Sequence, residues 1–148
     1  MRIFHSRPNL VSMVTGLIAV CWAALMFFLL SDPNPPGTGI GPSWLSSGVL
    51  EAAGHVGVSG VLAATLTCFA YNSRGRGRSI AGALVLVVFL SAGYAGLLES
   101  YQSTIPDRNA SWVDGALNAA GAIIGVMGVV VLPKVVSWVS VRSLEKGR

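Results

Sequence analysis

The sequence predicts an all-α integral membrane protein, in which one domain over residues 1–148 folds as a bundle of four transmembrane helices. Three observations lead to this fold class. Hydrophobic residues make up 53% of the chain and charged residues only 11%, whereas an ordinary soluble domain carries about 25% charged residues. The few charges are clustered, which leaves uncharged windows long enough to span a bilayer. The alternating segments of about ten residues that a transmembrane barrel requires are absent from the sequence.

The first helix is expected at about 9–30, because residues 10–30 carry no charge and two arginines precede them. A cleaved signal peptide is the alternative. Its apolar core usually has about 7–15 residues, and no small-x-small cleavage pattern precedes Ser31, so we expect a retained helix. The following segment, 31–44, is rich in proline and glycine and is expected to be an irregular connector.

Three further helices are expected at about 49–71, 79–98 and 112–132. The second contains the uncharged run 56–71, the third is uncharged throughout, and the fourth is uncharged from residue 115. After Pro133 the chain continues with valines, a tryptophan and flanking basic residues. This composition predicts either a short interfacial helix on the inner leaflet or an extension of the fourth helix.

The basic residues lie at one side of this layout. Nine of the ten are Arg2, Arg7, Arg74, Arg76, Arg78, Lys134, Arg142, Lys146 and Arg148. Because Lys and Arg near helix ends mark the cytoplasmic side, we expect both termini in the cytoplasm, in a multi-pass protein of the bacterial inner membrane. The arginines of "SRGRGR" at 73–78 are interpreted as orientation signals that contact membrane lipids. We expect no nucleic acid among the partners, since the segment is too short for such binding.

Polar residues gather at the expected outer ends of the second, third and fourth helices. The candidates for a functional pocket are Glu51, His55, Glu99, Gln102, Arg108, Ser111, Asp114 and Asn118. Residues four apart share a helical face, as Glu51 does with His55. An ionisable group at the bilayer centre costs about 2.5–3.5 kcal/mol, so such groups usually face the bundle interior. We therefore expect one outward-facing pocket built from three helices.

Several of these residues also have a purely structural interpretation. Ser111-x-x-Asp114 is a capping-box pattern, and Arg108 could only balance nearby acids. Gly121 and Gly125 are expected to allow close helix packing. Neither cysteine lies in a metal-binding spacing, and we expect no metal and no cofactor. No HExxH, GxSxG or P-loop pattern is present, so no catalytic residue is assigned.

The spacing of the polar block resembles the VanZ-like membrane protein family. The residues that carry this resemblance are Glu99-x-x-Gln102, Ile105-Pro106-x-Arg108 and Ser111-x-x-Asp114-x-x-x-Asn118-x-x-Gly121. His55, with an acid four residues earlier, is similar to the family's upstream motif, although Ser59 stands where a tyrosine is frequent. The resemblance implies a cell-envelope protein. The founding member is linked to resistance to teicoplanin-type glycopeptides, and some relatives lie beside envelope polysaccharide genes.

Three functions compete on this basis. The leading hypothesis is a non-enzymatic protein that binds a lipid-linked wall or polysaccharide precursor, or an envelope-assembly partner. Arg108 would pair a phosphate or carboxylate, while Gln102 and Asn118 donate hydrogen bonds. The alternative is an intramembrane enzyme that uses His55, Glu51, Glu99 and Asp114 as acid–base groups. A proton- or ion-coupled carrier is disfavoured because the charges lie at one depth.

Overall fold

The computed structural model describes residues 10–31, 47–74, 79–105 and 111–146. In these ranges the protein has four helices and no strand: α1 spans Leu10–Ser31, α2 Ser47–Ser73, α3 Ala81–Gln102 and α4 Trp112–Lys146. Each helix is long and apolar enough to cross a membrane. The four predicted membrane helices are thereby confirmed, and they indicate a multi-pass membrane protein.

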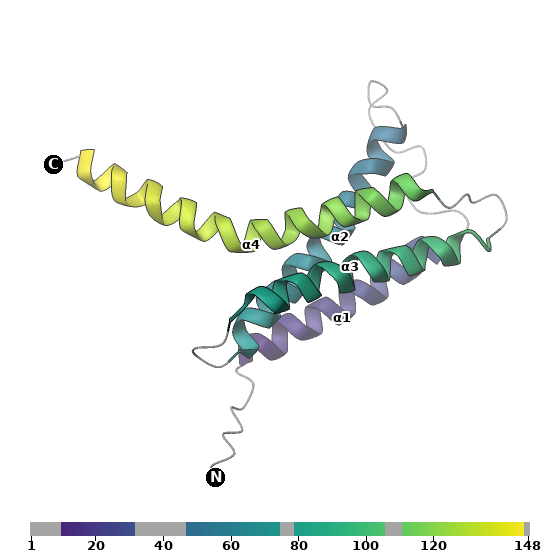
Figure 1. Ribbon diagram of the computed structural model, residues 1–148, viewed down its shortest axis with the longest axis horizontal. Helices are drawn as coiled ribbons and strands as arrows, with labels where there is room; N and C mark the ends of the chain where they lie inside the picture. Colours follow the sequence, from purple (N-terminus) through teal and green to yellow (C-terminus); the bar gives the residue numbers. More distant parts are fainter. Residues whose placement is uncertain (1–9, 32–46, 75–78, 106–110, 147–148) are drawn as a thin grey trace, which may run out of the picture.

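The largest difference from the predicted boundaries is at the end of α4. The helix does not stop before Pro133 but continues through it to Lys146, so the C-terminal segment extends α4 and forms no separate short helix. A proline inside a helix removes one backbone hydrogen bond and bends the helix. Figure 1 shows α4 bent, with its C-terminal part leading away from the other three helices.

The distribution of side chains is that of a protein whose surroundings are apolar. Large hydrophobic side chains point outward, and Phe28, Phe89 and Leu97 are each more than two-thirds exposed. The buried positions instead hold many small or hydroxyl-bearing residues, among them Ser12, Ala19, Ser59, Ala63, Thr67, Ser91, Ala95 and Ala122. Small residues at helix contacts are typical of membrane bundles, because close backbone approach replaces the hydrophobic driving force that lipid removes.

The contact between α2 and α4 is the most extensive in the bundle, and α2 also packs against α1 and α3. Gly121 and Gly125 lie where the two backbones meet. A Cβ at Gly121 would stand 2.8 Å from the Cα of Val56, and one at Gly125 would stand 2.9 Å from the carbonyl carbon of Gly60. Real side-chain atoms essentially never approach so closely, so this packing requires glycine at both positions of α4.

Two aromatic side chains tie α1 to its neighbours. The indole Nε1 of Trp22 donates a hydrogen bond to the carbonyl oxygen of Val58 in α2, at 2.9 Å. The hydroxyl of Tyr94 in α3 donates one to the carbonyl oxygen of Ala23, at 2.7 Å. Buried tryptophan and tyrosine usually satisfy their polar tips in this way. These bonds place α1 at the side of the bundle opposite α4, with which it makes no direct contact in the described residues.

Candidate functional site

The chain direction reverses from helix to helix, which brings particular helix ends together. The start of α2, the end of α3 and the start of α4 lie at one end of the bundle. Glu51, Glu99 and Asp114 belong to these three segments, whereas Arg74 and Lys134 lie at the other ends of the spans. Within the four spans and the residue after α2, the acidic groups therefore lie at one end of the bundle and the basic groups at the other, while Glu145 lies farther along, near the C-terminal end of α4.

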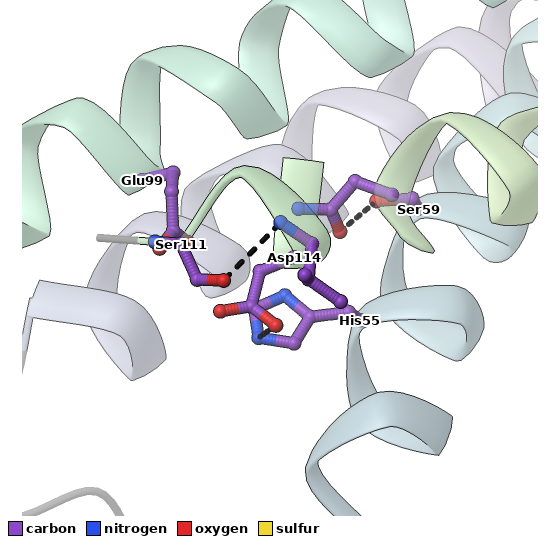
Figure 2. Close-up of polar contacts among 7 residues, drawn as sticks. His55, Ser59, Glu99, Ser111 and Asp114 are labelled. Carbon is purple, nitrogen blue, oxygen red and sulfur yellow. Dashed lines mark hydrogen bonds and ion pairs between the residues drawn. The ribbon is translucent and has the colours of Figure 1, made fainter. Parts of the chain in front are cut away.

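His55 and Asp114 face each other between α2 and α4 (Figure 2). The imidazole Nε2 lies 3.7 Å from the carboxylate Oδ1, and the two side chains are 10% and 17% exposed. This separation is too long for a direct hydrogen bond, yet it is short enough for electrostatic attraction to the carboxylate whenever the imidazole is protonated. The imidazole of His55 and the carboxylate of Asp114 are therefore close enough to contact the same small ligand.

A second polar contact lies one helical turn deeper. Ser59 Oγ donates a hydrogen bond of 2.7 Å to Asn118 Oδ1, and both side chains are buried. Ser59 follows His55 by four residues and Asn118 follows Asp114 by four, so the two contacts stack along the same faces of α2 and α4. Sequence reasoning named Asn118 but missed Ser59. The shared spacing of four residues was the signal that pairs them.

The third contact joins α3 to the start of α4. The backbone amide of Ser111 donates a hydrogen bond of 2.8 Å to Oε1 of Glu99, which is buried. Ser111 Oγ in turn accepts a hydrogen bond of 3.2 Å from the backbone amide of Val113, as the side chain of an N-cap residue does. Figure 2 shows Glu99 beside Ser111, and Asp114 directed toward His55 instead.

This third contact changes the meaning of the capping-box pattern. In a capping box the acid three residues into the helix accepts the hydrogen bond of the cap's own amide. Here Glu99 of α3 accepts that bond, so only the serine half of the predicted box is formed. The carboxylate of Asp114 is thereby released from a capping role and is available to the site between α2 and α4.

Glu51 completes the cluster from the first turns of α2. One ligand-type atom from each of Glu51, His55 and Asp114 lies within 4.8 Å of the other two. Glu51 is exposed, while the other two are half-buried. An imidazole with two carboxylates can bind a cation or accept hydrogen bonds from the hydroxyl groups of a ligand.

The remaining predicted site residues are placed less fully. Gln102 is buried at the last residue of α3. Arg108, predicted to pair an anionic group, lies outside the described residues. Gly121 and Gly125 lie one to two turns deeper than Asn118, at the α2–α4 contact.

An apolar groove of about 460 Å³ lies between α1, α2 and α3, away from the polar cluster. Its lining is Gly16, Ala19, Val20, Ala23, Leu62, Leu66, Phe69, Leu90 and Tyr94. This volume is within the range of ligand pockets, about 300–1,000 Å³. A groove with this lining suits a hydrocarbon chain.

The chain matches none of the protein-family models, curated proteins or solved structures with which it was compared. The resemblance to VanZ-like proteins is therefore one of residue spacing.

Proposed function

We propose that this chain is a VanZ-like, non-enzymatic protein of the bacterial inner membrane. It binds the polar head group of a lipid-linked precursor of the cell wall or of an envelope polysaccharide. The observation that supports this proposal most strongly is the meeting of polar side chains from three helices at one end of an otherwise apolar bundle. Ionisable groups in membrane helices are costly, and they usually mark a ligand pathway or binding site.

The proposed orientation places this end outside the cell and both termini in the cytoplasm. Arg74 and Lys134, at the other end of the spans, agree with an excess of basic residues on the cytoplasmic side. The pocket would then open toward the compartment in which envelope precursors are assembled.

The chemistry of the pocket suits a sugar joined to a lipid through phosphate. Carboxylates and imidazole accept hydrogen bonds from sugar hydroxyl groups, which is the role of Asp114 and His55 in this proposal. Arg108 pairs the phosphate, since a guanidinium matches its geometry. The apolar groove between α1, α2 and α3 supports a ligand that also carries a hydrocarbon chain.

The test is binding of a polyprenyl-diphosphate-linked sugar to the purified full chain in detergent, with the free polyprenol as the ligand control. Asp114→Asn and Arg108→Ala should each weaken binding about tenfold or more. A hydrogen bond to a charged group contributes about 1.5–3 kcal/mol, and about 1.4 kcal/mol is a factor of ten. Arg74→Ala, a basic residue at the opposite end, should bind as the wild type does. Equal binding by a helical, monodisperse Asp114→Asn variant would refute the proposal.

An intramembrane enzyme is the second candidate, and the approach of His55 to Asp114 favours it. An imidazole oriented by a carboxylate is a common general base. Turnover of the labelled precursor by purified wild-type protein, lost in His55→Ala, would establish this function. Unchanged precursor after prolonged incubation would leave binding as the activity.

The resemblance to the VanZ-like family also suggests a link to glycopeptide resistance. Expression of the chain in a susceptible bacterium should then raise the concentration of teicoplanin needed to stop growth. An Asp114→Asn variant that reaches the membrane in equal amount should not. An unchanged susceptibility in both strains would separate this chain from the resistance role of the founding member.

A further inference from the structure

The geometry points to a binding site for a divalent transition-metal ion formed by Glu51, His55 and Asp114, with Zn²⁺ as the cation that suits it best. The site goes beyond the proposed function, because metal binding is a property of these three residues and needs no lipid. The sequence led us to expect no metal, because neither cysteine lies in a metal-binding spacing. These ligands come from two helices that are far apart in the chain.

The distances fit a metal site that closes slightly around its ion. Bonds from Zn²⁺ to nitrogen and carboxylate oxygen are about 2.0–2.2 Å, so the ligand atoms of a tetrahedral site lie about 3.4 Å apart. His55 Nε2 and Asp114 Oδ1 are separated by 3.7 Å, close to that value. The three ligand-type atoms of the whole cluster lie within 4.8 Å of one another. Glu51 is exposed, so its side chain is able to rotate inward and close the remaining gap.

The donor set selects the class of cation. Imidazole nitrogen favours Zn²⁺ and neighbouring transition metals, whereas Mg²⁺ and Ca²⁺ prefer all-oxygen sites. One histidine with two carboxylates is a combination that Zn²⁺ accepts. Three protein ligands leave a fourth position open to water or to a ligand oxygen, which is the arrangement of zinc sites that bind exchangeable groups.

The surrounding structure fixes two of the three ligands in advance. The Ser59–Asn118 hydrogen bond lies one turn below His55 and Asp114 and holds their helices in register. Glu99 accepts the hydrogen bond that the Ser111 amide donates, so the Asp114 carboxylate is not used in capping. Rigid placement of this kind lowers the cost of assembling a metal site.

The charges of the cluster also favour a cation. Glu51 and Asp114 each carry a negative charge when ionised, and Asp114 is only 17% exposed. Carboxylates removed from water are unfavourable unless they are paired or coordinate a metal. A bound divalent cation would balance both charges at once.

One consequence depends on the proposed function. A pocket lined by acids repels the phosphate of a lipid-linked precursor, whereas a Zn²⁺ ion with an open coordination position attracts a phosphate oxygen. A bound metal ion would therefore allow a pocket lined by acidic residues to bind an anionic ligand.

The test is calorimetric titration of the purified, chelator-stripped full chain with ZnCl₂ alone. We expect one Zn²⁺ per wild-type chain and little heat with MgCl₂. Glu51→Gln, His55→Gln and Asp114→Asn should each weaken Zn²⁺ binding at least about tenfold, because even residues behind the ligands change affinity by about 10–100-fold. His5→Gln is the matched control, since it removes the chain's other imidazole, and it should bind as the wild type does.

Replacement of Zn²⁺ by Co²⁺ adds a spectroscopic readout. Visible ligand-field bands should appear in the wild type and be lost in His55→Gln, with helicity measured by circular dichroism in both. A Zn²⁺-dependent rise of the wild-type unfolding temperature supports the site without any variant. The inference is wrong if the wild type binds no Zn²⁺, or if His5→Gln and His55→Gln lose binding equally. If the chain binds Zn²⁺ but does not bind the polyprenyl-diphosphate-linked sugar, the metal site is supported and the proposed function is refuted.

Discussion

The close contact of α2 and α4 predicts that one Gly→Ala substitution on α4 destabilises the protein and another does not. At Gly121 an added Cβ would lie 2.8 Å from the Cα of Val56 and would also meet the carbonyl oxygen of that residue. Both atoms belong to the backbone of α2, so no side-chain rotation relieves the clash. At Gly128 the nearest atom to an added Cβ is the Cδ1 of Leu132, at 4.0 Å, which is ordinary contact.

The size of the effect follows from these distances. Moving the Val56 Cα from 2.8 Å to an ordinary 3.4 Å displaces one helix by at least about 0.6 Å, because the carbonyl oxygen of Val56 lies closer still. Overpacking of a tight contact typically costs about 1–3 kcal/mol. Ala in a helix interior is more favourable than Gly by about 0.5–1 kcal/mol. Gly121→Ala should therefore lower the free energy of unfolding by up to about 2.5 kcal/mol, the net of these opposing effects, while Gly128→Ala should leave it unchanged or raise it.

The assay is equilibrium unfolding of the purified variants in mixed detergent micelles, followed by far-ultraviolet circular dichroism. Gly121→Ala should also weaken Zn²⁺ binding, since it moves Asp114 relative to His55. The reasoning fails if the two variants shift stability by the same amount and in the same direction, because the α2–α4 backbone contact would then have no energetic role.

Three further predictions concern the polar cluster. In a double-mutant cycle measured by the same unfolding assay, Ser59→Ala and Asn118→Leu should show a coupling energy of about 0.6–1.7 kcal/mol. Additive effects of the two substitutions would mean that the two side chains do not interact. Glu99→Ala should lower the free energy of unfolding by about 1–3 kcal/mol, because the amide at the start of α4 loses its hydrogen-bond acceptor. Glu99→Gln keeps an oxygen at this place, so thermal unfolding should show a smaller loss of stability. In a variant without the native cysteines, Glu51→Cys should react with an impermeant maleimide in intact cells, and Lys134→Cys only after permeabilisation. The reverse labelling pattern would invert the proposed orientation.

The fold was predictable because membrane spans are encoded locally. Uncharged windows fixed the four helices to within a few residues at most ends. The helix ends that were predicted wrongly are those where the local sequence pattern alone does not determine where the helix stops. Glu99 was taken to end the third helix because it is charged, but it is buried against the Ser111 amide and the helix continues to Gln102. The fourth helix was expected to end at about 132, with an extension past Pro133 as one of two alternatives, and it continues through Pro133 with a bend.

The position of the polar cluster in the bundle was predictable from the sequence, and the pairing of its side chains was not. Alternating helix direction was enough to bring the start of α2, the end of α3 and the start of α4 to one end. Local pattern allowed Asp114 either a capping box or a place in the pocket, whereas the structure gives the capping acceptor role to Glu99 and leaves Asp114 facing His55. The replacement of Asp114 by Glu99 as the acceptor depends on contacts between helices, so no residue spacing within one helix reveals it. The approach of Asp114 to Glu51 and His55 also depends on two helices, so no local spacing reveals it.

The most direct measurement is cysteine cross-linking between α2 and α4 in membranes. The pair Ser59→Cys with Asn118→Cys should form a disulfide on mild oxidation, because the side chains they replace are in contact at 2.7 Å. The pair Val61→Cys with Ala120→Cys has the same separation in sequence, but both positions are exposed, and it should remain reduced. Mass spectrometry of the intact chain reports both outcomes. Equal cross-linking of the two pairs, or none at the first, would contradict a polar site shared by these helices.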